Sequence, residues 1–508
     1  MLRLGGLPLV VVVVSFGFLL CHPLTLGRAD ESHLLHGARR VLDGDVLYRD
    51  FLEIITPLGF YFFAAVYRLF GTTLRAARVA MAVVEAIGAG AMFVLARRLG
   101  GAGPAALAAM VFVAVCVPVW PIASAHWMST SLALLTAAVL LDDRAALPSR
   151  ARLLASGVLT GVAICVQQHR GLFLALWLGT AIAVLALAAP TPGRSRRLLR
   201  DLTWGVGPAF GVSVIVLGHA AVAASPALMI DALYRFPVET YAKTMSIDIR
   251  WADVLPLTDE TLPYTWHWLL RVAPVFPVIE AAVLVGQARY GLARDHVIRG
   301  CVCLLSLLSA VSVWYLRDFI HVAFVTPVLL LPGTRLLAAG QGAIRNRVPR
   351  GRSIGVAALF LAGGIVAVKG VTNVARAYAA APVELDTAFG RLRERPEIAN
   401  LYAAVARHVV REPDGAALAY FFPDDAWLYL TLPARDAARF DILLLTFPRR
   451  YIDEVTALLR ARVPGTVALL NLPVFPAGEI RDAVVTGYDL VEHAGSYEIY
   501  VRRGMQTP

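Results

Sequence analysis

Long apolar runs alternate with short polar loops along this chain, a pattern typical of proteins that cross a membrane many times. A helix needs about 20 apolar residues to cross a bilayer. Segments of roughly that length lie at 7–26, 76–96, 102–120, 126–141, 153–168, 171–189, 203–224, 264–287, 297–315, 319–338 and 353–374. The pattern predicts a polytopic α-helical membrane protein with about eleven transmembrane helices. The first is expected to be retained, because its apolar part is long for a signal peptide.

The loops between these segments divide into two sets that alternate along the chain. One set is rich in arginine, and the positive-inside rule assigns it to the cytoplasm. Its members are Arg97, Arg98, Arg144, Arg150, Arg152, Arg194, Arg196, Arg197, Arg200, Arg289, Arg294, Arg299, Arg345, Arg347, Arg350 and Arg352. The other set holds the segments 27–72, 120–127, 167–170, 225–262, 317–321 and everything after residue 375. We expect these parts to meet on the extracytoplasmic side.

The first extracytoplasmic loop, 27–72, is too long to be a simple turn. Apolar residues within 32–42 recur at helical spacing, which predicts an amphipathic helix. The aromatic-rich segment 57–71 is short for a span, so we expect it to lie in the membrane interface. If it crossed the membrane, every later loop would change sides and the arginines would face outward.

The composition shifts beyond residue 375 and predicts a small extracytoplasmic α/β domain over 376–508, attached to a membrane domain over 1–375. The pattern predicts a helix at 391–411, strands at 417–422, 442–447 and 467–472, helices at 451–462 and 478–486, and a hairpin at 488–502. No glycine-rich phosphate loop opens any of these helices, so we expect a lid or docking domain.

Overall composition agrees with the membrane class: 58% of the residues are hydrophobic and 16% are charged, against about 25% charged in soluble proteins. The net charge of +11 could indicate nucleic-acid binding. Most basic residues lie in short loops between apolar runs, so we assign this charge to topology and expect no nucleic-acid partner.

Charged residues concentrate in the loop 27–72, at the mouth of the bilayer. Its segments 27–31 and 48–53 hold Arg28, Asp30, Glu31, Arg49, Asp50 and Glu53. Because charges are costly near hydrocarbon, such a cluster is a candidate functional site. Asp30 also suits the N-cap of the helix at 32–42, so capping and chemistry are both open for it. Asp50 and Glu53 are three residues apart and could share a helix face.

The motifs of this loop are RADE at 28–31, GDVLYRDF at 44–51, TPLG at 56–59 and LFG at 69–71. Together they resemble the first outer loop of superfamily C (GT-C) glycosyltransferases, multi-spanning enzymes that use polyprenyl-phosphate sugars. The loop is most similar to bacterial proteins related to the protein O-mannosyltransferases and the lipid A aminoarabinose transferase. Weaker similarities are QHRG at 168–171 and Arg317-Asp318 followed by His321, and Thr56 stands where some relatives have a histidine.

The resemblance implies an inverting transfer from a polyprenyl-phosphate sugar to a lipid, polysaccharide or protein acceptor, at the extracytoplasmic face of a bacterial inner membrane. Asp30 matches the family's loop aspartate and would be the general base, with Glu31 as its companion. The leaving phosphate needs cations, and Arg170, Arg317 and His321 are the candidates, although an arginine at a membrane boundary also snorkels to lipid headgroups.

Four further residues of the loop are candidates for substrate binding: Tyr48, Arg49, Asp50 and Glu53. The last two would bind sugar hydroxyls or a divalent cation; two carboxylates alone do not define a metal site, so no metal ligand is assigned and a cation stays open as a cofactor.

Two other functions are compatible with a polytopic chain. A transporter or flippase of lipid-linked glycans would be expected to show internal repeats and charges near mid-span. No clear repeat is present, and the charges cluster at one face. A non-catalytic scaffold with the same fold would not depend on Asp30.

Overall fold

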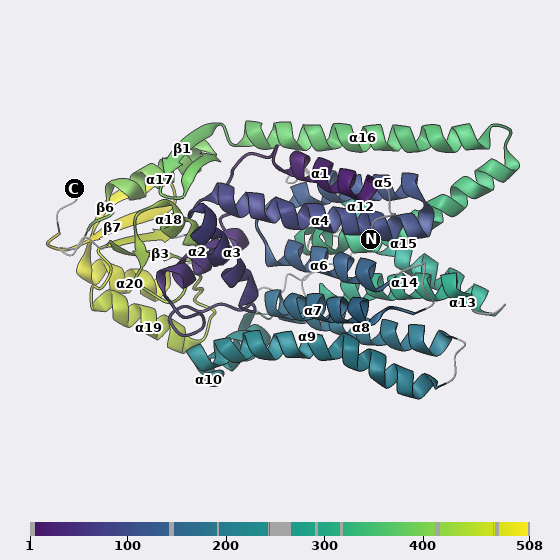
Figure 1. Ribbon diagram of the computed structural model, residues 1–508. Coiled ribbons are helices and arrows are strands. Elements are labelled where there is room, and N and C mark those ends of the chain that lie inside the picture. Colours follow the sequence, from purple (N-terminus) through teal and green to yellow (C-terminus); the bar gives the residue numbers. More distant parts are fainter. Residues whose placement is uncertain are drawn as a thin grey trace.

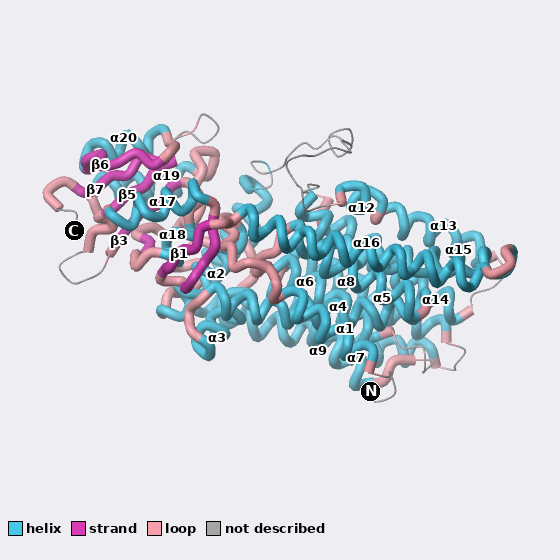
Figure 2. Tube along the Cα trace, turned by 90° about the horizontal axis from the view of Figure 1, so that it is seen from above, coloured by secondary structure: helices cyan, strands magenta, loops and turns pink. Residues whose placement is uncertain are grey.

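The computed structural model describes residues 6–141, 147–189, 193–241, 243, 266–289, 293–314, 319–411, 417–470, 472 and 477–505. A long helical bundle carries a small region of strands and helices at one end (Figures 1 and 2). We call this the sheet end of the bundle, and the opposite one the loop end.

Within the described residues, eight helical segments are long and apolar enough to cross a membrane. They are α4 (Leu74–Gly100), α5 (Ala102–Val111) with η1 (Phe112–Cys116) and η2 (Val117–Val119), α8 (Gln168–Ala188), α9 (Arg194–Ala224), α12 (His267–Val272) with α13 (Val275–Ala288), α14 (Arg294–Ser312), α15 (Phe319–Arg347) and α16 (Gly351–Ala380). Three shorter helices pack beside them: α1 (Leu7–Leu19), α6 (Ala125–Leu140) and α7 (Arg150–Val166). Together these elements match the predicted spans, so the polytopic helical fold is confirmed.

Helix direction alternates along the bundle as the loop charges predicted. The junction of α15 with α16, which carries Arg345–Arg352, lies at the loop end, as do Arg97 and Arg98 at the end of α4 (Figure 1). The polar segments that open α2, α6, α8 and α15 lie at the sheet end. The two sets of polar segments therefore occupy opposite ends of the bundle.

Two helices of the loop 27–72 lie at the sheet end and do not cross the bundle. They are α2 (Asp30–Asp43) and α3 (Leu58–Phe70), which pack against each other. Because α4 begins at this same end, α3 leaves the alternation of the later helices unchanged. Gly44 closes α2 with a φ of +103°, a conformation that glycine adopts without strain.

The chain then returns to the sheet end at the close of α9. Here lie α10 (Pro226–Ile230), η3 (Asp231–Arg235) and η4 (Pro237–Tyr241), and the segment from Asp231 onward contacts the C-terminal region. Asp231 accepts hydrogen bonds from Arg450 at 2.7 Å and from the Tyr451 hydroxyl at 2.8 Å. Phe236 packs edge-on against Phe447.

The C-terminal region combines a hairpin with a five-stranded mixed sheet. Its elements are β1 (Val383–Thr387), β2 (Gly390–Glu394), α17 (Pro396–Arg407), β3 (Leu418–Phe422), α18 (Ala426–Thr431), β4 (Arg435–Asp436), α19 (Arg449–Arg460), β5 (Thr466–Leu470), α20 (Gly478–Gly487), β6 (Tyr488–Ala494) and β7 (Tyr497–Arg502). The order in the sheet is β4-β3-β5-β7-β6, parallel from β4 to β5 and antiparallel beyond. The predicted α/β region is confirmed.

Two local predictions in this region are wrong. Residues 391–394 pair with β1 instead of opening a helix, because Gly390 at φ +94° turns the chain back into a hairpin. Residues 442–447 form no ladder, apart from a single bridge between Ile442 and Asp424. Leu443 and Phe447 are nevertheless buried in the core, so their apolar pattern indicated burial rather than strand pairing.

Candidate functional site

Asp30 is the first residue of α2, and its side chain is exposed at the sheet end. The N-cap is Ala29, and no side chain caps the helix, so the capping alternative for Asp30 is wrong. Its carboxyl group lies beside the positive end of the helix dipole. Asp30 is therefore an accessible carboxyl group at the position where the base is predicted.

Glu31, the next residue, is fully buried and has a different environment. It forms an ion pair with Arg78 at 2.7 Å and accepts hydrogen bonds from the backbone N–H groups of Ala123 and Gly27, both at 2.7 Å. Burial raises the pKa of Glu31, and Arg78 and the two backbone donors oppose that shift. These contacts tie α2 to α4 and to the segment before α6, and they occupy the oxygens that a proton acceptor needs.

The segment between α2 and α3 is a compact loop, so the expectation that Asp50 and Glu53 share a helix face is wrong. Tyr48 has a φ of 70°, is fully buried, and donates a hydrogen bond to the Ile55 carbonyl at 2.9 Å. Arg49 pairs with Asp50 at 2.8 Å on the surface, and Asp50 also accepts from the Val46 N–H. These contacts shape the loop; their use in substrate binding stays a prediction.

Glu53 is buried, and its Oε1 atom has no hydrogen-bond partner among the described residues. Burial raises the pKa of Glu53 to about 8; His33 and Arg40 oppose this shift, and Asp441 adds to it. The carboxyl group is thus mostly protonated at neutral pH. It combines a free hydrogen-bonding atom with a pKa near the physiological range, as functional carboxyls often do.

One face of α2 carries a polar stripe that docks on the C-terminal region. His33 pairs with Asp424 at 2.6 Å, and His36 pairs with Asp441 at 2.8 Å. Arg40 lies 3.7 Å from Asp436 and 4.0 Å from Asp441. The sequence reasoning missed this stripe, although its spacing of three and four residues is that of one helix face. Its acidic partners lie some 390 to 405 residues away and had no recognisable signal.

Burial opposes the charged form of His33, but the attraction of Asp424 and the hydrogen bond to it outweigh burial and raise its pKa to about 10. His33 is therefore a cation at neutral pH. It also acts on Glu53, whose pKa it lowers.

Two of the three predicted phosphate-binding residues meet around one histidine. Arg170, in the first turn of α8, donates to the His126 carbonyl at 2.7 Å and to the Thr130 hydroxyl at 2.8 Å. His321, in the first turn of α15, packs edge-on against His126 at 5.0 Å between ring centroids. Arg317 lies outside the described residues. Arg170 is buried, so a substrate phosphate would meet it inside the bundle.

The loop and this histidine cluster adjoin each other. The Gln168 side chain at the start of α8 donates to the Ile54 carbonyl at 2.7 Å, and Thr56 donates to the Ile164 carbonyl at 2.8 Å. Glu53 and Arg170 thus belong to neighbouring segments at the sheet end. The described residues contain no group of three or more His, Cys, Asp or Glu side chains arranged to hold a metal ion.

Comparison of the whole chain with known proteins identifies its fold. No protein-family model matches it, and no curated protein matches its sequence. Among solved structures, ArnT from Cupriavidus metallidurans bound to undecaprenyl phosphate is similar at a TM-score of 0.58, with 16% identity over 97% of each chain. The Archaeoglobus fulgidus oligosaccharyltransferase tethered to an acceptor peptide is similar at a TM-score of 0.58, with 11% identity over 99% of this chain and 75% of that one.

A further structure of the Archaeoglobus fulgidus enzyme, in complex with Zn and sulfate, gives a TM-score of 0.56 with 11% identity over 97% of this chain and 73% of that one. The described helices and sheet of this chain thus share the fold of these two membrane enzymes, in agreement with the fold that the loop motifs implied.

Proposed function

We propose that this chain is an inverting glycosyltransferase that moves a sugar from a polyprenyl-phosphate donor to an acceptor at the sheet end of the bundle. The observation that carries the proposal is the exposed carboxylate of Asp30 at the start of α2, in a fold shared along its whole length with ArnT. The ArnT structure is bound to undecaprenyl phosphate and the oligosaccharyltransferase structure is tethered to an acceptor peptide, which supports this choice of donor and of an external acceptor.

The reaction needs one general base and one open face of the anomeric carbon, where the acceptor attacks. Asp30 accepts the proton of the acceptor hydroxyl, and the acceptor oxygen attacks the anomeric carbon. The bond from that carbon to the phosphate oxygen breaks, and its electron pair leaves with the polyprenyl phosphate. Arg170, Arg317 and His321 stabilise the negative charge on this leaving group, while Tyr48, Arg49, Asp50 and Glu53 position the sugar.

The arginine bias of the loop end supports placing that end in the cytoplasm and the sheet end outside it, and the resemblance of the first loop to bacterial transferases supports a bacterial inner membrane. Residues 1–375 then form the catalytic membrane domain, and 376–508 form an extracytoplasmic domain that docks on α2. Because α16 continues to Ala380, this boundary falls within its last turns. The zinc-containing neighbour supports a divalent cation as a cofactor class, but the described residues offer it no ligand set, so no step is assigned to it.

The test is sugar transfer by purified protein, with a panel of labelled undecaprenyl-phosphate sugars as donors and bacterial membranes as the acceptor source. Asp30→Asn is expected to slow transfer about 10²- to 10⁴-fold, the usual contribution of a general base. Asp43→Asn is the matched control, because Asp43 is an exposed carboxylate at the other end of α2. Undiminished transfer by folded Asp30→Asn protein would show that Asp30 is not the base.

A further inference from the structure

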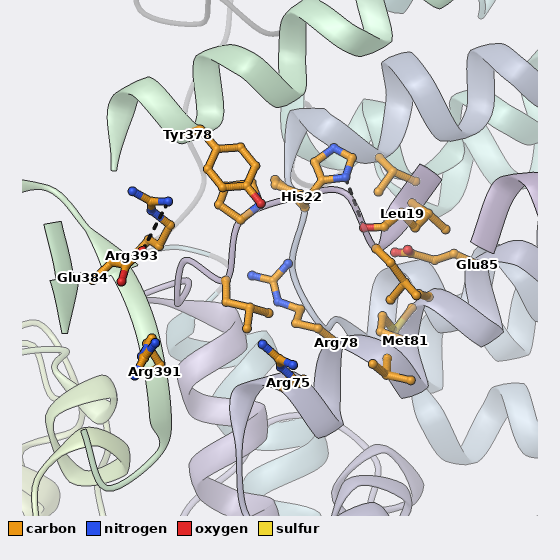
Figure 3. A pocket seen from close by; sticks show the side chains of 17 residues that line it. Leu19, His22, Arg75, Arg78, Met81, Glu85, Tyr378, Glu384, Arg391 and Arg393 are labelled. Carbon is orange, nitrogen blue, oxygen red and sulfur yellow. Dashed lines mark hydrogen bonds and ion pairs between the residues drawn. The ribbon is translucent and has the colours of Figure 1, made fainter. Parts of the chain in front are cut away.

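A cavity of about 490 Å³ lies between α1, α4, η2, α16 and the β1–β2 hairpin. It is lined by residues from the end of α1 and the first turns of α4 on one side, and by β2 on the other (Figure 3). None of the predicted site residues that the structure describes lines it.

The cavity has a cationic side and an apolar side. Arg75 and Arg78 of α4 face Arg391 and Arg393 of β2 across it (Figure 3). Leu19, Leu20, Val79, Met81 and Ala82 form the apolar wall next to the bundle. Four arginines against two glutamates, Glu85 and Glu384, leave the lining positively charged.

The arginines differ in how far they are already engaged. Arg78 is held by Glu31, and Arg393 lies 3.6 Å from Glu384 and donates to the Ala381 carbonyl. Arg391 pairs with Asp386 at 3.2 Å, where both side chains are mostly exposed. Arg75 is exposed and makes no ion pair or hydrogen bond with the described residues. Arg75 and the weakly held Arg391 are therefore available to an anion.

Two buried polar groups lie deeper in the cavity. The Glu85 carboxyl is 4% exposed and points into the cavity, and Nε2 of His22 has no hydrogen-bond partner among the described residues. Nδ1 of His22 lies 3.3 Å from the Leu19 carbonyl, which can only accept, so Nδ1 carries the hydrogen and Nε2 is an acceptor. These acceptors suit the hydroxyl groups of a ligand.

The position of the cavity indicates that such a ligand would enter from the bilayer. The apolar stretch of α16 is only 17% buried in the molecule, so most of its surface is left for lipid. Leu20 and Val79 on the cavity wall are also partly exposed, at 46% and 38%. A ligand with a charged head between the arginines and an apolar chain along α1, α4 and α16 matches this arrangement of cationic and lipid-facing apolar surfaces.

We propose that this cavity binds the headgroup of a phosphate-bearing lipid drawn from the bilayer, with Arg75 and Arg391 as its principal phosphate contacts. Guanidinium groups donate paired hydrogen bonds that match phosphate oxygens. The site is separate from the residues assigned to sugar transfer, and it does not depend on that function. The same headgroup chemistry is carried by polyprenyl phosphates and by bulk anionic phospholipids.

The test is native mass spectrometry of the purified full chain, titrated separately with undecaprenyl phosphate, phosphatidylglycerol and uncharged diacylglycerol. The double variant Arg75→Ala/Arg391→Ala is expected to bind phosphate-bearing lipid about 30-fold more weakly than the wild type. Arg68→Ala/Arg460→Ala removes two other exposed arginines and the same charge, and is expected to bind as the wild type does. Both pairs are exposed, so both variants should keep the wild-type unfolding midpoint.

The lipids distinguish the source of the ligand. Loss of undecaprenyl phosphate binding alone indicates a polyprenyl site, and equal loss of both phosphate lipids indicates a general phospholipid site. Equal affinities in the cavity and control variants, or binding of diacylglycerol as tight as that of the phosphate lipids, would overturn the proposal. Since Asp30→Asn leaves these arginines intact, failure of the transfer assay and failure of lipid binding are separate results.

Discussion

Glu31 and Glu53 are two buried carboxyls at opposite ends of the segment that carries α2, and they differ in how completely their oxygens are paired. Glu31 is matched by Arg78 and by two backbone N–H groups. Glu53 keeps one oxygen without a partner among the described residues, and its pKa rises to about 8. Burial is the largest influence on both, so the difference lies in what each carboxyl contacts.

This contrast separates a structural role from a chemical one within a single loop. A carboxylate whose oxygens are all occupied joins α2, α4 and the α6 entry, and it has no capacity left for a substrate. A carboxyl with a free oxygen and a pKa near neutrality can exchange a proton or a hydrogen bond. Glu53 is therefore a better candidate for substrate contact than Glu31, the companion of Asp30 in sequence.

Removing the Glu31 charge gives the largest expected effect on stability. Glu31→Gln leaves Arg78, whose side chain is 16% exposed, without its counter-ion, and breaking a buried pair costs about 3–5 kcal/mol. We expect a large fall in the unfolding midpoint of the detergent-purified protein. Glu397→Gln, at an exposed site on α17, is the control and should change it little. A Glu31→Gln protein as stable as this control would mean that Glu31 has no structural role through its pair with Arg78.

Much of this arrangement was predictable from the sequence, and the rest depends on contacts across the fold. Helical spacing predicted α2, and alternating loop charges predicted which segments meet at the sheet end. The pairing of His36 with Asp441 could not be predicted, because only the docking of the C-terminal region brings them together. The roles expected for Glu31 and Glu53 were likewise based on neighbours in sequence, whereas Arg78 and His33 decide their environments.

Glu53→Gln tests the other half of the comparison through its pH dependence. The folded-state pKa of Glu53 is raised, so its contribution to stability is present below pH 4.5 and is lost as pH rises to about 8. The slope in this window is up to about 1.4 kcal/mol per pH unit. Glutamine does not titrate, so the stability of the variant relative to the wild type should increase from pH 5 to pH 9.

The measurement is the unfolding midpoint of wild type and variant across that range, with Glu397→Gln again as the exposed control. Parallel curves would mean that Glu53 ionises in the folded protein as it does in water. The free oxygen would then face solvent, and its distinction from Glu31 would no longer rest on burial.

His33→Gln is expected to have the smallest effect, and it links the loop to the C-terminal region. Loss of the charged hydrogen bond to Asp424 should cost about 1.5–3 kcal/mol near pH 6. The folded-state pKa of His33 is raised to about 10, so its stabilisation is complete below about pH 6.5 and is lost as pH rises to 10. The difference in unfolding midpoint between wild type and variant should shrink over that interval. The control His493→Gln, at an exposed site, should show no such change.

Because His33 lowers the pKa of Glu53, the effects of His33→Gln and Glu53→Gln on the unfolding midpoint should be non-additive. Strict additivity would mean that the docking contact and the unpaired carboxyl act independently, and that the C-terminal region has no influence on the loop through this pair.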